Sequence, residues 1–216
     1  MAAALIGGLV GKGQAPGGIR VVELQPETRA RLAAQFGIVC VDAVAAALPL
    51  GEVVVLAVKP QQMRAAVQAL KPQLARELVI SIAAGIRLAD LSRWLGGYPT
   101  LVRCMPNTPA LIGAGISGLY AGAAIAAGQR ALAEIILGAV GATLWVSEES
   151  QLDPVTAISG SGPAYVFYFI EALQQAAQEM GFSAEDARKL AVETFAGTAK
   201  LAAQSPEDLA LLRERV

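Results

Sequence analysis

The chain has 216 residues, of which 55 % are hydrophobic, and its formal net charge is −1. This apolar content favours a buried globular core over disorder. A balanced charge without a basic tract argues against a nucleic-acid or membrane-surface partner. The chain has no histidine and only two cysteines, Cys40 and Cys104, so neither a disulfide framework nor a metal site is expected. Glycine, proline or charge breaks every apolar run before it reaches membrane-spanning length, and we expect a cytoplasmic protein.

The N-terminal segment AAALIGGLV predicts a helix in which Gly7 and Gly8 allow close packing on a sheet. In a dinucleotide-binding α/β protein, a strand and a glycine-rich turn stand before such a helix. Nothing precedes it here, so we hypothesise that the numbering starts at an internal Met of a longer chain. The alternative, an ordinary first helix, stays open.

Strand-like and helix-like segments alternate over residues 1–150. Strand-like runs are expected at 19–24, 38–41, 52–58, 77–85, 100–109, 115–122 and 142–147. Helices are expected at 26–37, 42–48, 59–74 and 127–141. This alternation predicts an α/β domain with a doubly wound, mostly parallel sheet and right-handed crossovers.

The pattern becomes purely helical after residue 150. The segment 163–181 carries its bulky side chains on one face, and two later helices begin with capping-box-like pairs, Ser183 with Asp186 and Ser205 with Asp208. We therefore divide the chain into a dinucleotide-binding domain at 1–150 and a helical domain at 151–216.

Three segments that follow predicted strands carry candidate binding residues, because ligands of open α/β sheets bind outside the carboxyl ends of strands. Lys59, followed by Pro60, could hold a phosphate, a ribose or a carboxylate, or could be a solvated lysine. The small residues that end ISIAAG would let a flat ring approach, or would simply pack tightly. In VRCMPNTPA, two prolines stiffen a loop that carries Asn107 and Thr108.

The segment ISGSGPAYVF places Ser159 to Gly162 before Pro163, at the expected start of a long helix. Backbone N–H groups and two hydroxyls there would make an anion site, and the alternative is a capped helix that binds nothing. Glu23, at the end of the first strand-like run, lies where an acid can hydrogen-bond an adenosine ribose. An acid there favours NAD, although Arg29 and Arg31 are close enough to weaken that inference.

Taken together, LAVKPQ, SIAAGI, VRCMPNTPA, PVTAISGSGPAY and AAALIGGL resemble the pyrroline-5-carboxylate reductase family, in order along the whole chain. The resemblance implies a Rossmann-like domain that binds NADPH or NADH, followed by an all-helical dimerisation domain. It implies hydride transfer to the cyclic imine pyrroline-5-carboxylate, which gives L-proline in the last step of proline biosynthesis, and a homodimer or higher homo-oligomer.

The same resemblance implies roles for individual positions. Ala57, Val58, Lys59 and Pro60 would line the cofactor site, and Ile82, Ala83 and Ala84 would lie along its nicotinamide side. Asn107 would shape the same crevice, and Ser159, Gly162 and Pro163 would lie near the substrate. Against the family pattern, the strand before the first helix and a later substrate-contacting loop are missing, so we expect weak or no activity from these 216 residues alone.

Two other interpretations remain. A 3-hydroxyacid dehydrogenase also joins such a domain to helices, but it uses a lysine in the first long interdomain helix, and residues 159–181 contain none. A non-catalytic dimerisation protein could have kept the fold and lost the chemistry.

Overall fold

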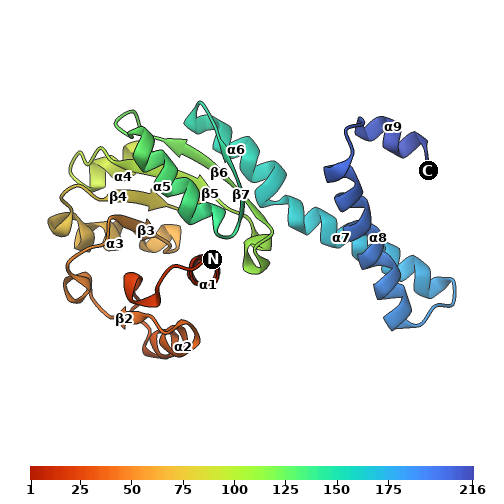
Figure 1. The fold of residues 1–216 in the computed structure, drawn as a ribbon, viewed down its shortest axis with the longest axis horizontal. Helices are drawn as coiled ribbons and strands as arrows, with labels where there is room; N and C mark the ends of the chain where they lie inside the picture. Colours follow the sequence, from red (N-terminus) through yellow and green to blue (C-terminus); the bar gives the residue numbers. More distant parts are fainter. The chain divides into compact units, whose positions relative to one another are not determined.

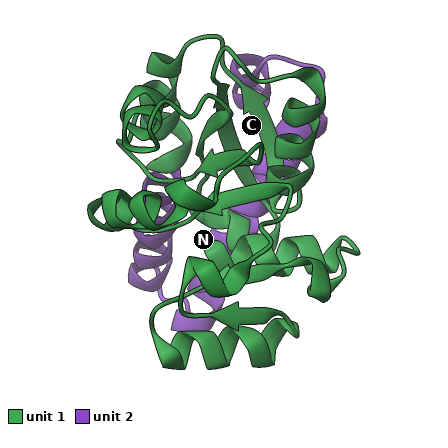
Figure 2. Ribbon diagram, turned by 90° about the vertical axis from the view of Figure 1, so that its left-hand side faces the viewer, with its two compact units in different colours: residues 1–161 green, residues 162–216 purple.

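The computed structural model describes all 216 residues, in two compact units. The first unit is Met1–Ser161 and the second is Gly162–Val216 (Figure 2). This boundary lies later in the chain than the predicted one at 150/151. The first unit extends further because Leu152 is fully buried in it and packs, with Val155, on its sheet. We describe each unit by itself.

The strands of the first unit form two separate sheets (Figure 1). The smaller sheet pairs β1 (Arg20–Val22) with β2 (Val39–Val41) in parallel. The larger has the order β3-β4-β5-β6-β7. Its strands are β3 (Val53–Leu56), β4 (Leu78–Ser81), β5 (Leu101–Met105), β6 (Gly115–Ala121) and β7 (Gly141–Trp145). All neighbours in it are parallel except β5 and β6.

Helices connect these strands. The α-helices of the first unit are α1 (Ala2–Gly11), α2 (Pro26–Phe36), α3 (Pro60–Leu70), α4 (Leu88–Trp94), α5 (Ala127–Gly138) and α6 (Leu152–Val155). Those of the second unit are α7 (Gly162–Glu179), α8 (Ala184–Gln204) and α9 (Leu209–Glu214).

Alternate residues of the buried strands belong to two different hydrophobic cores, one on each face of the sheet, as a doubly wound sheet requires. In β4, Leu78 and Ile80 pack with α1 and α5, whereas Val79 packs with α3 and α4 on the opposite face. The predicted α/β class is therefore confirmed. All four residues of β4 are buried, because helices cover both faces of the sheet.

Four details of the predicted first domain are corrected. The expected single sheet is two sheets, because β1 and β3 share no ladder. The expected helix at 42–48 is a short 3-10 helix, Val44–Ala47, and α4 was not predicted. Gly7 and Gly8 do allow close packing, but against helices: a Cβ on Gly8 would lie 2.6 Å from the carbonyl oxygen of Ala139, and one on Gly7 would lie 3.1 Å from the ring of Phe36.

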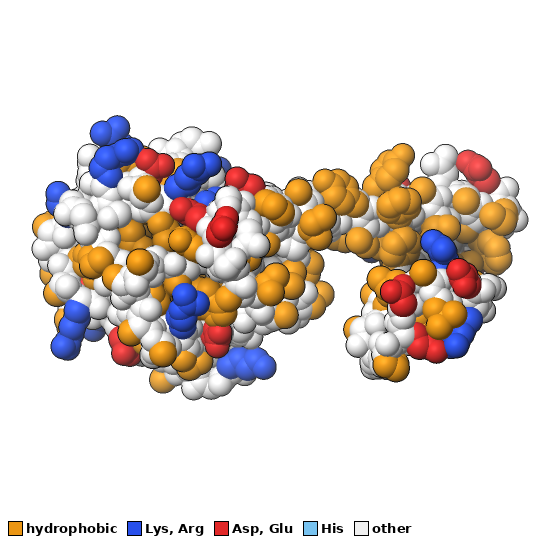
Figure 3. Space-filling view, turned by 90° about the horizontal axis from the view of Figure 1, so that it is seen from above, with side chains coloured by type: hydrophobic (Ala, Val, Ile, Leu, Met, Phe, Trp, Pro, Cys, Tyr) orange, Lys and Arg blue, Asp and Glu red, His pale blue; other side chains and the backbone are white.

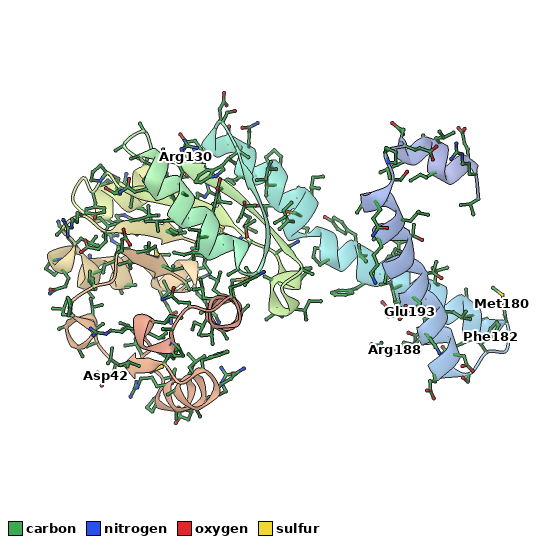
Figure 4. The ribbon with its side chains drawn as sticks, in the orientation of Figure 1. Asp42, Arg130, Met180, Phe182, Arg188 and Glu193 are labelled. Atoms are coloured by element: carbon green, nitrogen blue, oxygen red, sulfur yellow. The ribbon has the colours of Figure 1, made fainter.

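The second unit is a hairpin of α7 and α8 followed by α9. Ser183 caps α8 by accepting a hydrogen bond from the Asp186 N–H, as the sequence predicted. The buried side chains are small, Ala187 and Ala191 of α8, whereas α7 has none. Met180 and Phe182 are exposed at the turn between the two helices (Figure 4).

Large apolar side chains cover much of the outside of this helical unit (Figure 3). Along α7 the exposed ones are Tyr165, Val166, Phe167, Tyr168, Phe169 and Leu173. An apolar surface of this kind on a small helical unit is typical of a protein–protein interface. None of the helices is both long enough and apolar enough to traverse a bilayer.

Candidate active site at the carboxyl ends of the strands

The predicted cofactor-binding residues follow β3 and β4, which are adjacent and parallel. Leu56 pairs with Ser81, and Ser81 with Arg103 of β5, so the carboxyl ends of these three strands lie at one edge of the sheet. The Ile82 N–H donates to the Leu56 carbonyl over 3.2 Å and extends the pairing by one residue. The segments 57–60 and 82–84 therefore leave the sheet side by side.

This edge is open and lined by small side chains. Ala57, Lys59 and Pro60 are exposed and Val58 is half-buried. In the neighbouring segment, Ala84 is exposed, Ile82 is half-buried and Ala83 is buried in the core. Gly85 follows in the left-handed region, at a φ of 75°, and open space surrounds the position that a Cβ would take there. A flat ring or a polar chain can approach such an edge closely.

Glu23 lies just after β1, where its side chain stabilises the local turn. Its Oε1 accepts a hydrogen bond from the Gln25 N–H over 2.9 Å. Arg29, from α2, donates to the carbonyl oxygens of Glu23 and Leu24 over 2.8 and 2.9 Å. This strand end therefore presents a carboxylate and a guanidinium together, so both charge signs are available to a ligand.

Asn107 follows β5 and is nearly fully buried, and its amide is used by the protein itself. Its Oδ1 accepts from the Ile116 N–H over 2.9 Å, and its Nδ2 donates to the Ser159 carbonyl over 3.1 Å. A backbone N–H can only donate and a carbonyl can only accept, so these partners determine the orientation of the amide. Asn107, predicted as catalytic, acts here as a connection between β6 and the segment that holds Ser159.

Ser159 lies in a π-helical turn, Thr156–Gly160, that follows α6 directly. Pro163 lies in the first turn of a long helix, as expected, but helical turns precede that helix, so its start is not a free helix N-terminus. The chain is already helical from Leu152, and the Ser161 N–H donates to the Thr156 carbonyl over 2.8 Å. The Ser159 hydroxyl donates to the Val155 carbonyl over 2.9 Å. The Ser161 N–H and the Ser159 hydroxyl are therefore already bonded within the protein.

Gly162 and Pro163 are the first residues of α7. They open the second unit and are half-buried. Their predicted place near the substrate stays a prediction.

Arg103 is a residue that sequence reasoning missed. It lies on β5 with only 5 % of its surface exposed, and its guanidinium lies 3.1 Å from Glu149 and 3.8 Å from Asp153. Glu149 also accepts a hydrogen bond from the Leu88 N–H at the start of α4. The signal in the sequence was a charged residue inside an otherwise apolar strand-like run. A buried arginine needs an acidic partner, so such a residue indicates an ion pair.

Known families match both parts of the chain. Residues 149–216 match the family model described as pyrroline-5-carboxylate reductase dimerisation, and residues 1–85 match that of NADP oxidoreductase, coenzyme F420-dependent. The chain is 48 % identical over 217 residues to pyrroline-5-carboxylate reductase of Pseudomonas aeruginosa, covering 100 % of this chain and 80 % of that one. The chain belongs to the pyrroline-5-carboxylate reductase family.

Solved structures of the family share the fold described here. A pyrroline-5-carboxylate reductase from Coxiella burnetii superposes with a TM-score of 0.92 at 37 % identity, covering 99 % of this chain and 80 % of that one. The Plasmodium falciparum pyrroline carboxylate reductase with NADP bound gives a TM-score of 0.87 at 25 % identity, covering 99 % and 79 %. The predicted order of a Rossmann-like sheet and a helical dimerisation domain is thereby confirmed.

The exposed strand edge fits the dinucleotide cofactor of this family. The small side chains of Ala57 and Ala84 leave room for a flat ring, and Gly85 adds open space beside them. The roles of Lys59 toward phosphate oxygens and of Glu23 toward a ribose hydroxyl stay predictions.

Proposed function

We propose that this protein reduces the cyclic imine pyrroline-5-carboxylate to L-proline with NADPH or NADH, the last step of proline biosynthesis. The observation that supports this most strongly is the 48 % identity to the Pseudomonas aeruginosa reductase, which extends over the entire chain. The matched length spans both the strand edge of the first unit and the helical second unit.

In this proposal the first unit binds the cofactor at the strand edge. Ala57, Val58, Lys59 and Pro60 line the cofactor site, where Lys59 holds a phosphate or ribose oxygen. Ile82 and Ala84, with the buried Ala83 between them, lie along its nicotinamide side. Glu23 accepts from the adenosine ribose. When bound, the reduced nicotinamide supplies the hydride for the C=N carbon.

The chain's own contribution to the reaction is binding and orientation. Holding two reactants in a productive geometry removes much of the entropic barrier of a bimolecular step. The π turn with Ser159, together with Gly162 and Pro163 at the start of α7, forms the substrate side. These residues are half-buried, and we place the substrate ring against them.

The second unit serves homo-oligomer formation, and we propose a homodimer built on the apolar surface of α7 and α8. The match of residues 149–216 to a dimerisation model supports this assignment. A cytoplasmic location, where reduced nicotinamide cofactors are maintained, belongs to the same proposal.

The test is a cofactor-oxidation assay with chromatographic detection of proline. Imine-dependent loss of NADPH or NADH with matching formation of proline supports the proposal. A protein that binds the cofactor but forms no proline above the enzyme-free rate would contradict it, and would favour the non-catalytic interpretation.

A further inference from the structure

The segment from Glu149 to Gly160 is held at both ends by side chains of one strand and its extension. Arg103, on β5, pairs with Glu149 at the start of the segment. Asn107, four residues later along the chain, donates to the Ser159 carbonyl near the end of the segment. Because the spacing of Arg103 and Asn107 is set by an extended backbone, the two contacts determine where the segment begins and ends.

Packing supports the same two attachments. A Cβ on Gly118 of β6 would lie 2.7 Å from Cγ1 of Val155 and 3.2 Å from Cδ2 of Leu152, so α6 lies directly on the sheet backbone. At the other end, a Cβ on Gly160 would lie 2.9 Å from Cε of Met105, the last residue of β5. The segment therefore contacts the sheet at the points where the polar contacts hold it.

The backbone between these attachments departs from regular α-helix. The Ser161 N–H bonds five residues back, to Thr156, and two side chains bond to carbonyls four residues back: Thr156 to Leu152 over 2.7 Å and Ser159 to Val155 over 2.9 Å. Single π-helical turns inside helices are rare, and they persist where the surroundings favour them. The Nδ2 of Asn107 supplies such a contact, because it bonds to the Ser159 carbonyl within the turn.

We propose that Arg103 and Asn107 are positioning residues that hold the π turn, Thr156–Gly160, against the end of β5 and so set the substrate side of the reaction. This inference rests on the proposed function. Neither side chain has to touch the substrate: Arg103 is buried against carboxylates, and the partners of Asn107 are backbone atoms. Losing either contact is expected to affect turnover more than cofactor binding, because the cofactor segments follow β3 and β4.

The decisive variant is Asn107→Asp. The carboxylate keeps the acceptor for the Ile116 N–H but loses the donor, and it places an oxygen against the Ser159 carbonyl. The matched control is Tyr98→Phe, which removes another hydrogen bond from a side chain to a carbonyl, the 2.6 Å contact to Glu77 at the opposite end of β4. Both variants lose one such bond, but only one of the two losses is at the turn.

Two readouts are compared. Hydrogen exchange at the Ser161 amide should become about five- to tenfold faster in Asn107→Asp and stay unchanged in Tyr98→Phe. With NADPH saturating, kcat for pyrroline-5-carboxylate should fall about tenfold in Asn107→Asp, while the dissociation constant for NADPH, measured by fluorescence, changes less than about twofold.

The two readouts test two separate claims. Unchanged hydrogen exchange at the Ser161 amide in Asn107→Asp would refute the claim that Asn107 holds the π turn. Faster exchange with unchanged kcat would refute the claim that this contact positions the substrate side of the reaction. A wild-type protein without turnover would contradict the proposed function, and exchange alone would then decide whether the hold exists. If Asn107→Asp does not fold, Glu149→Gln tests the other end, with faster exchange expected over residues 152–156 and unchanged exchange contradicting the proposal.

Discussion

Replacing Arg103 by methionine should destabilise the first unit by about 3–5 kcal/mol. Its guanidinium lies 3.1 Å from the Glu149 carboxylate, and the two side chains are 7 % and 22 % exposed. At this distance the attraction is about 5 kcal/mol for an effective dielectric constant near 20, offset in part by desolvation of both groups. Arg103→Met leaves that carboxylate largely buried, with Leu88 as its remaining close donor.

A double-mutant cycle separates the pair from the packing around it. Glu149→Gln keeps an acceptor for the Leu88 N–H, so Arg103→Met combined with Glu149→Gln leaves no unpaired buried charge. We expect the double variant to be more stable than the sum of the single losses implies, with a coupling energy of roughly 2 kcal/mol or more.

An exposed pair provides the control. Arg93 and Asp90 lie 2.6 Å apart on α4, and their side chains are 70 % and 38 % exposed, so the same cycle there should give about 0.3–0.5 kcal/mol. Urea unfolding followed by tryptophan fluorescence is suitable, because both tryptophans lie in the first unit. A loss below about 1 kcal/mol for Arg103→Met, or equal coupling in both pairs, would refute the reasoning.

Three further predictions follow from single positions. Burial raises the pKa of the Cys104 thiol to about 12, from an ordinary value of 9.0, so the folded protein keeps a proton that the unfolded chain releases. The free energy of unfolding should therefore fall by about 1.4 kcal/mol per pH unit as the pH rises above about 9. Cys104→Ala should remove this part of the pH dependence of the urea midpoint. Gly118→Val places side-chain atoms where α6 packs and should cost about 1–3 kcal/mol, whereas Gly17→Ala, with open space around it, should change stability little; thermal melting distinguishes them. Lys59→Gln should weaken NADPH binding several-fold in a fluorescence titration while Lys71→Gln does not, and equal affinities would contradict the assignment of Lys59 to the cofactor site.

Local pattern was sufficient for most of the fold. Apolar runs such as 52–58 and 77–85 predicted the strands, and Pro26 with Gly37 predicted the start and end of α2, where Gly37 adopts a φ of 67°. Each of these signals lies within a few residues of the element that it predicts, because turn geometry and helix termini are local properties.

Local sequence patterns predicted the candidate site less well than the fold. Asn107 was singled out from its two flanking prolines, but its partner Ser159 is 52 residues away, so its structural use could not be read from the sequence. Arg103 and Glu149 are 46 residues apart. The π turn was missed because Pro163 suits the first turn of a helix equally well whether or not helical residues precede it.

The most direct test of the account follows an isotope from the reduced cofactor into the product. With NADPH deuterated at the transferable position of the nicotinamide ring, the account predicts that the protein forms L-proline carrying one deuterium on the ring carbon of the former C=N bond. Proline without deuterium, or deuterium-free NADP⁺ appearing with no proline formed, would contradict hydride transfer to this imine.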